Sequence, residues 1–219
     1  MNCIVTAGPT YEPLDDVRRL TNFSTGRLGS ELAHLLSARG HHVTLLIGQQ
    51  ATWRGERHAL ETQPFTTTQD LRLRLQALST QPFGAVFHAA AVSDFAFGKI
   101  WERTTAGDLR EVKAGKISSR SGTLLAELTP TPKIIFELRA WFPSAFLVGW
   151  KYETDGDRAE VIAKAEAQLT ENRTDGCVAN GRAYGSGFGL VTSKARHEHF
   201  HDTAALFNAL ESLAVGRLA

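Results

Sequence analysis

The chain gathers polar and charged side chains directly behind its first apolar run. Ile4 to Ala7 is typical of a buried parallel strand, and Gly8 supplies the turn after it. Before Gly26 opens an amphipathic helix, a long insertion carries Glu12, Asp15, Asp16, Arg18, Arg19 and Asn22. A dinucleotide-binding unit would start its helix at once through G-x-G-x-x-G. A reaction at a phosphate or a carboxylate, unlike a redox reaction, needs reactive side chains at this place.

The start of that helix suits a phosphate group. Ser24, Thr25 and Gly26 offer hydroxyls, free backbone N–H groups and the positive end of a helix dipole. The alternative is an ordinary N-cap, in which Ser24 or Thr25 satisfies the first turn. The neighbouring turn at Gly8 favours phosphate binding.

These segments carry a family resemblance. Residues 6–18 read T-A-G-P-T-Y-E-P-L-D-D-V-R, and residues 20–26 read L-T-N-F-S-T-G. Together they resemble the signature of phosphopantothenate–cysteine ligase. Three further segments match in the family's order: residues 89–94 (A-A-A-V-S-D), 127–132 (E-L-T-P-T-P) and 148–154 (V-G-W-K-Y-E-T). The similarity runs from residue 2 to about residue 181.

The resemblance implies roles for three residues. Asn22 takes the place of the asparagine that binds phosphopantothenate and the activated acyl intermediate, although a lone loop asparagine is often turn chemistry. Arg18 takes the place of the motif's arginine and, with Asn22, would hold the substrate and the intermediate. Lys116 matches a lysine that would neutralise phosphate charge or polarise the acyl group. Lys113 is the alternative to Lys116, and either lysine could simply be solvated.

The remaining site residues that the resemblance implies belong to the nucleotide. His88, Ala89, Ala90, Ala91 and Asp94 would contact it, and its base pocket would be walled by Pro132, Ile134, Ile135 and Trp150. Bacterial relatives commonly place lysines late in the helix at 157–171, where this chain has Gln168 and Asn172, with Lys164 a turn earlier. The choice between CTP and ATP therefore stays open.

The composition excludes several other classes of protein. The 219 residues suit one α/β domain over 1–219, and a formal charge of +1 argues against a nucleic-acid coat. No apolar run reaches membrane-spanning length, so a cytoplasmic protein is expected. Cys3 and Cys177 are interpreted as buried small hydrophobes rather than a redox pair. His197, His199 and His201 would share one face of a strand and are interpreted as a solvent or interface stripe, so no side chain is assigned to a metal.

The pattern of apolar runs predicts a Rossmann-like α/β fold, a parallel sheet with helices on both faces. Strands are expected at 2–7, 42–47, 84–90, 145–150 and 174–178. Helices are expected at 26–39, 68–79, 133–141, 157–171 and 203–215. Residues 95–122, rich in Gly, Lys, Arg and Ser, are predicted to be a long mobile active-site loop, and 181–201 a loop with an edge strand or hairpin. Ligands would gather at the carboxyl ends of the strands.

The resemblance implies a ligase of coenzyme A biosynthesis. 4′-Phosphopantothenate would react with CTP, or with ATP, to give an acyl-nucleotidylate, which the amine of cysteine then attacks. Mg²⁺ is expected with the nucleotide; no flavin is expected, and a homodimer is implied by the family alone. Two alternatives remain: a nicotinamide-dependent reductase, for which the chain lacks the Gly-rich turn and a Tyr-x-x-x-Lys pair, and a non-catalytic nucleotide-binding homologue.

Overall fold

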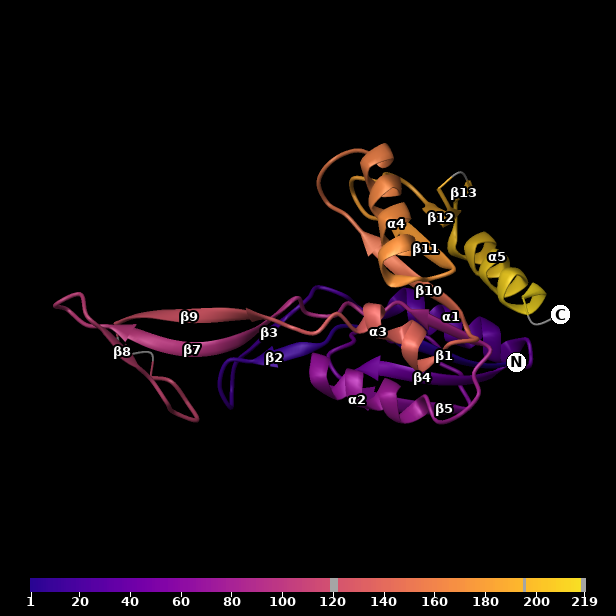
Figure 1. Cartoon of the computed structure of the whole chain (residues 1–219). Helices are drawn as coiled ribbons and strands as arrows, with labels where there is room; N and C mark the ends of the chain where they lie inside the picture. The colour runs from indigo at the N-terminus through magenta and orange to yellow at the C-terminus, as the bar shows by residue number, and fades with distance from the viewer. Residues whose placement is uncertain (119–121, 195, 218–219) are drawn as a thin grey trace.

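A sheet of eight strands forms the centre of the computed structural model, which describes residues 1–118, 122–194 and 196–217. Residues 119–121 of the predicted loop, residue 195 of the segment 181–201, and residues 218–219 lie outside the described residues. The strand order is β13-β12-β11-β10-β6-β1-β4-β5 (Figure 1). Their bounds are β1 (Asn2–Ala7), β4 (His42–Gly48), β5 (Glu61–Phe65), β6 (Ala85–His88), β10 (Phe146–Tyr152), β11 (Gly176–Asn180), β12 (Phe188–Ser193) and β13 (Arg196–Phe200).

The strands from β11 to β5 run parallel, and β12 and β13 add an antiparallel edge. The central strands β1, β4 and β6 are buried almost continuously, so their alternating side chains supply apolar surface to both faces of the sheet. One face packs against α1 (Arg27–Ala38) and α5 (Thr203–Gly216). The other packs against α2 (Thr68–Leu78), α3 (Ile134–Trp141) and α4 (Arg158–Asn172). The predicted Rossmann-like fold class is confirmed.

Three helices begin at side chains that accept a hydrogen bond from the first turn. Thr67 Oγ1 accepts from the Asp70 amide at 3.1 Å at the start of α2. Asp157 forms a capping box with Glu160 at the start of α4. Asp202 Oδ1 accepts from the Ala205 amide at 2.8 Å at the start of α5. These caps fix where the helices start, and so place the predicted helix boundaries within a residue or two of those observed.

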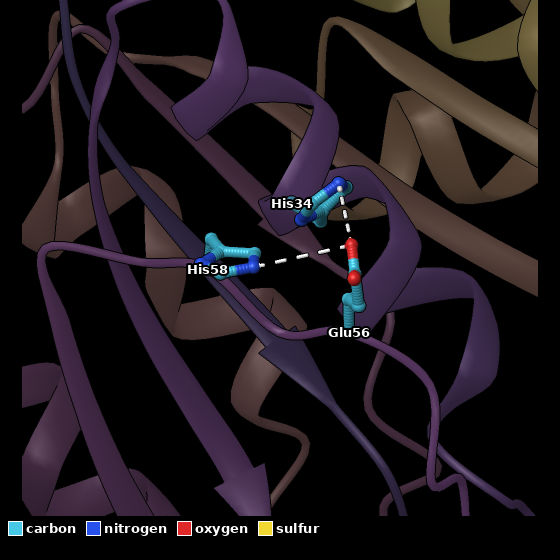
Figure 2. Close-up of side chains that lie close together, drawn as sticks. All are labelled: His34, Glu56 and His58. Atoms are coloured by element: carbon cyan, nitrogen blue, oxygen red, sulfur yellow. Dashed lines mark ion pairs between the residues drawn. The ribbon is translucent and has the colours of Figure 1, made fainter.

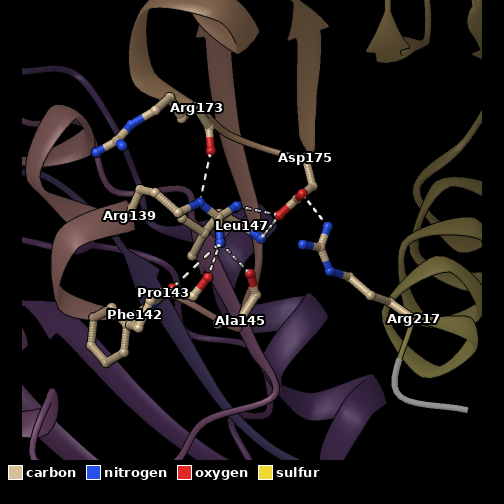
Figure 3. Close-up of polar contacts among 8 residues, drawn as sticks. All are labelled: Arg139, Phe142, Pro143, Ala145, Leu147, Arg173, Asp175 and Arg217. Atoms are coloured by element: carbon tan, nitrogen blue, oxygen red, sulfur yellow. Dashed lines mark hydrogen bonds and ion pairs between the residues drawn. The ribbon is translucent and has the colours of Figure 1, made fainter.

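A half-buried arginine fastens the end of the domain that is opposite the strand carboxyl ends. Arg139 of α3 donates to Asp175 at 2.6 Å and also to the backbone carbonyls of Pro143, Ala145 and Arg173 (Figure 3). Asp175 accepts in turn from the Leu147 amide at 2.8 Å and from Arg217 at the end of α5. One carboxylate therefore joins α3, β10, the entry to β11 and α5 through two ion pairs and a backbone hydrogen bond, because its two oxygens have partners on different elements.

The predicted loop over 95–122 is a folded arm instead. Three antiparallel strands make it, in the order β8-β7-β9: β7 (Phe95–Arg103), β8 (Leu109–Glu111) and β9 (Thr123–Pro130). The arm extends away from the central sheet and lies beside a short hairpin of β2 (Tyr11–Pro13) and β3 (Arg19–Thr21) (Figure 1). The sequence concealed these strands because they bury little on either face, which leaves no apolar alternation to recognise.

Two further details complete the comparison with the predicted elements. β5 was missed: its residues are Glu-Thr-Gln-Pro-Phe, and only Phe65 is buried, as befits a polar edge strand that contains a proline. Cys3 and Cys177 are free and buried, as predicted, and burial raises the pKa of each thiol to about 12. Neither thiol is therefore poised as a nucleophile.

Candidate functional site

A cavity of about 660 Å³ opens at the carboxyl ends of β1 and β6. The chain crosses from β1 to β4 on one side and from β6 to β10 on the other, so this is the point where the strand order reverses. Open α/β sheets bind ligands at such a point. Its lining comes from residues 22–29, residues 89–92, Asp94, residues 150–152, Gln168 and Asn180.

Three glycines bring the floor of the cavity together. Gly8 and Gly26 both have φ of +79°, a conformation that other residues rarely adopt. A Cβ on Gly26 would lie 3.2 Å from the Gly8 Cα, and a Cβ on Gly29 would lie 2.6 Å from the Ala7 Cβ. The glycines therefore let the start of α1 approach the end of β1, as in a dinucleotide-binding turn, despite the insertion between them.

The first turn of α1 faces the cavity without a side-chain cap at its N-cap residue. Its N-cap is Gly26, and in the described chain no side chain accepts a capping hydrogen bond there. The Arg27 amide donates to Thr25 Oγ1 at 3.3 Å, and the Trp53 amide holds the Thr25 carbonyl at 3.0 Å. The alternative of an ordinary Ser24 or Thr25 N-cap is therefore not what the chain forms, and the arrangement suits an anion.

Beneath the cavity, buried polar side chains tie the first motif to residues 88–93. Thr10 Oγ1 accepts from the Ser93 amide at 2.8 Å. Thr6 Oγ1 contacts His88 Nδ1 at 2.9 Å and accepts from the Ala90 amide at 3.1 Å. Glu12 Oε1 accepts from the Thr68 amide at 2.9 Å, at the start of α2. These residues hold backbone in place rather than face a ligand.

Asn22 does face the cavity. Its Nδ2 donates to the Ala91 carbonyl at 3.1 Å, and the Thr10 amide donates to the same carbonyl at 3.2 Å. The contact fixes the side-chain amide beside the residues that follow β6. Asn22, Ser24, Thr25, Gly26, Ala89, Ala90, Ala91, Asp94 and Trp150, all predicted from the sequence, are thus brought together around one cavity.

The far wall holds buried polar atoms without partners. Among the described residues, neither Trp150 Nε1 nor Asn180 Oδ1 has a hydrogen-bond partner. Gln168 Nε2 lies 3.2 Å from Cys177 Sγ. Because an unsatisfied buried donor or acceptor costs free energy, a polar ligand that paired with Trp150 and Asn180 would recover it.

The charged groups at the cavity are already engaged with one another. Asp94 pairs with Lys133 outside the lining, and Arg27 pairs with Glu31 at 2.7 Å. Lys151 pairs with Glu153 at 3.2 Å, and Lys164 reaches the same carboxylate at 2.5 Å. Hydrogen bonding to Lys164 lowers the pKa of Glu153. An incoming polyanion would compete with these carboxylates for the cations.

Several predicted site residues lie elsewhere. His88 is buried beneath the cavity, and burial lowers its pKa to about 4. Ile134 belongs to the core under α3, where it is 1% exposed. Gly8, Pro132 and Ile135 do not line the cavity either. For His88 and Ile134 the motif position marks a residue that supports the site from below, since each packs against the strands that carry the lining.

Arg18 and Lys116 are held at the junction of the arm and the β2–β3 hairpin, and neither lines the cavity. Arg18 donates to Asp15 and, at 2.6 Å, to the Ile117 carbonyl. Asp15 Oδ2 accepts from the Ile117 amide at 3.1 Å. Arg18 thereby holds the pKa of Asp15 well below its usual range. Lys116 itself is exposed, beside the anchored Ile117, so its position is set by this junction.

Lys151, Tyr152 and Asn180 line the cavity but were not predicted as site residues. A usable signal existed: β10 and β11 end at Tyr152 and Asn180, and these two residues lie opposite one another in the parallel register. Because ligands meet the carboxyl ends of parallel strands, the last residues of β10 and β11 are expected at the site even outside the motifs.

The described residues contain no helix that combines the length and apolarity required to cross a bilayer. The fold and the cavity define a Rossmann-type α/β domain with a cavity at the switch point of the sheet, where such folds bind their ligands. Residues 1–204 match the model of the DNA/pantothenate metabolism flavoprotein C-terminal domain. The chain belongs to this family.

Two curated relatives and one solved structure place the chain within the family. It is 34% identical over 185 residues to the coenzyme A biosynthesis bifunctional protein CoaBC of Thermococcus kodakarensis, covering 84% of this chain and 42% of the relative. It is 30% identical to phosphopantothenate–cysteine ligase 2 of Oryza sativa, covering 88% and 72%. The crystal structure of the DNA/pantothenate metabolism flavoprotein of Streptococcus pneumoniae superposes with a TM-score of 0.84 at 25% identity, covering 99% of both chains. The chain spans less than half the length of CoaBC.

Proposed function

We propose that this chain is a ligase that joins 4′-phosphopantothenate to cysteine through an acyl-nucleotidylate, in coenzyme A biosynthesis. The names of its relatives support this activity, both the stand-alone ligase and the bifunctional protein. A carboxylate is a poor electrophile until it carries a good leaving group. Attack by the carboxylate oxygen on the α-phosphorus releases pyrophosphate, and attack by the cysteine amine on the acyl carbon then releases the nucleoside monophosphate.

The observation that carries the proposal is the meeting of Asn22 with the uncapped first turn of α1 in one cavity. The backbone N–H groups after Gly26 would take the phosphates. Asn22 would hold the acyl group, since its amide donates and accepts without carrying charge. Both groups then face the same volume, as transfer from phosphate to carboxylate requires.

Asn180 and the indole of Trp150 would bind the polar edge and the face of the base, which accounts for their unpaired buried atoms. Lys116 would approach the phosphates from the arm. Arg18 would act on Lys116 indirectly, by fixing the backbone at Ile117. The family resemblance, by contrast, implies that Arg18 holds the substrate directly.

Mg²⁺ would accompany the triphosphate, with CTP favoured over ATP as co-substrate. Mg²⁺ usually keeps several waters and is held through phosphates and one or two carboxylates. Of the described residues that line the cavity, Asp94 alone is acidic, so it fits the role of that carboxylate. When bound, the ion offsets phosphate charge. Neither step of the proposed reaction changes an oxidation state, so the reaction needs no flavin. We also propose a cytoplasmic homodimer, with family resemblance as the support for the dimer.

The proposal is tested by incubating the purified protein with 4′-phosphopantothenate, cysteine, Mg²⁺ and either CTP or ATP. Pyrophosphate release that depends on phosphopantothenate, together with formation of phosphopantothenoylcysteine, is expected. A control without cysteine should release no more than about one pyrophosphate per enzyme, because the intermediate stays bound. Nucleotide binding without either product would favour a non-catalytic homologue instead.

A further inference from the structure

Two histidines and a glutamate converge on the outer face of α1, away from the cavity described above. His34 lies on α1, while Glu56 and His58 belong to the segment 51–60 that crosses in front of it (Figure 2). Their side chains point toward one another, and the potential ligand atoms all lie within 4.8 Å. Among the described residues, this is the only group of three histidine, cysteine or acidic side chains whose ligand atoms are close enough to share one ion.

The distances within the cluster leave a gap rather than close hydrogen bonds. Glu56 Oε2 lies 3.7 Å from His34 Nε2 and 4.0 Å from His58 Nε2. Both separations exceed the range of a hydrogen bond. The imidazole rings are 4.9 Å apart. In a tetrahedral site with bonds of about 2.0–2.2 Å, the ligand atoms would be roughly 3.3–3.6 Å apart. A small rotation of these side chains would therefore close them around an ion.

The free nitrogens are oriented for coordination. His34 Nδ1 is buried and, within the described chain, makes no hydrogen bond, so Nε2 is the nitrogen it presents to Glu56. Glu56 is mostly exposed, with 78% of its side chain accessible, and His58 is similarly open at 67%. An ion can thus reach the cluster from solvent, and the exposed side chains can adjust to it.

We propose that His34, Glu56 and His58 form a binding site for a divalent transition-metal ion of the Zn²⁺ class. Two imidazoles and a carboxylate are a donor set that suits zinc, with water in the remaining position. The ion would fasten the segment 51–60 to α1. That segment also holds the phosphate-binding turn, because the Ala51 side chain packs beside Gly8 and Gly26, and the Trp53 amide donates to the Thr25 carbonyl.

The test measures Zn²⁺ binding calorimetrically and Co²⁺ binding by visible absorption, on protein first treated with a chelator. We expect one ion per chain and the absorption bands of a tetrahedral site with Co²⁺. His34→Gln and His58→Gln should each weaken binding by more than about tenfold. His197→Gln, an exposed histidine on β13, is the matched control and should bind as the wild type does.

Thermal unfolding of the metal-free variants separates lost ligands from lost folding. All three glutamine variants should unfold at the wild-type temperature, because the replaced side chains are partly or fully exposed. Unchanged binding in both His34→Gln and His58→Gln would overturn the proposal. So would loss of binding in His197→Gln alone, which would place the ion on the C-terminal histidine stripe.

Discussion

The motif residues divide between two regions with opposite surroundings. Beneath the cavity, Thr6, Thr10, Glu12, His88 and Ser93 are buried and bonded to backbone or to one another. At the rim and along the arm, Asn22 and Lys116 are exposed. The residues of the family motif are therefore of two kinds, buried residues that support the site and exposed residues around it. Buried motif residues keep strand ends and helix starts in register, and under the proposed function the exposed ones would meet the ligand.

The division predicts separate consequences for substitutions in the two regions. Substitution of a buried motif residue should lower the free energy of unfolding, because it leaves a buried polar partner without its hydrogen bond. A rim residue should affect turnover at unchanged stability, since it has no packing to lose. The predictions below run from the largest expected effect to the smallest.

Lys116→Gln should lower turnover about a hundredfold, equivalent to about 2.7 kcal/mol of barrier, because it removes the cation that we propose approaches the phosphates. Lys113→Gln, in the same exposed turn and paired with Glu111, is the matched control. Steady-state pyrophosphate release and thermal unfolding would be measured on both. Wild-type turnover in the Lys116 variant would shift the assignment to Lys113, and a lower unfolding temperature would mean that the rim is structural after all.

Gly29→Ala should lower the free energy of unfolding by about 1–3 kcal/mol, because its Cβ would lie 2.6 Å from the Ala7 Cβ and 2.8 Å from the Thr6 carbonyl oxygen. Gly216→Ala is the control within another helix. Apart from its chain neighbours and the backbone of its own helix, no heavy atom of the described residues lies within 4 Å of the Cβ position there, so that variant should be neutral or slightly stabilised. Chemical denaturation compares the two. Equal stabilities would show that α1 can retreat from β1 without cost.

The pH dependence of stability should report His88. Burial lowers its pKa to about 4, whereas an unfolded histidine titrates near 6.5. The unfolded chain therefore binds more protons as the pH falls through this window. The free energy of unfolding should drop by about 2 kcal/mol between about pH 7.5 and about pH 5. His88→Gln should flatten that slope; if the slope persists unchanged, another group is responsible.

The arm should become less accessible when ligands bind. Its basic, exposed turns leave cleavage points near Arg110, Lys113 and Lys116. Limited proteolysis should be rapid in the empty protein and severalfold slower with nucleotide and phosphopantothenate present, if the arm closes to exclude water. Because Arg18 anchors Ile117, we expect the arm to move as one body. Equal rates would contradict a lid and weaken the assignment of Lys116.

Much of the fold was predictable, because the parallel strands are short apolar runs and the helices carry clear caps. Residues 42–48 are an example: six of them are buried in a row, and such a run needs no tertiary information to be recognised. The arm was not predictable as strands. Its residues bury little against the rest of the molecule, so their pairing depends on backbone hydrogen bonds that leave no apolar pattern.

The site was predictable in part for a related reason. Asn22 and the residues after β6 lie in distinctive motifs and do meet at the cavity. Asn180 was missed because it is an isolated strand-end residue, and only the alignment of β11 with β10 brings it to the same edge. His88 was misplaced because a motif gives sequence position without showing which way a side chain points along a strand.

The central claim is that chemistry belongs to the exposed rim, and Asn22→Asp tests it most directly. The measurement is the amount of acyl-nucleotidylate per enzyme after rapid quench, with 4′-phosphopantothenate, nucleotide and Mg²⁺ but without cysteine. We predict that the wild type accumulates bound intermediate. The variant should accumulate little at wild-type unfolding temperature, because the new carboxylate repels the anionic groups of the substrate. Equal accumulation in both proteins would contradict the account.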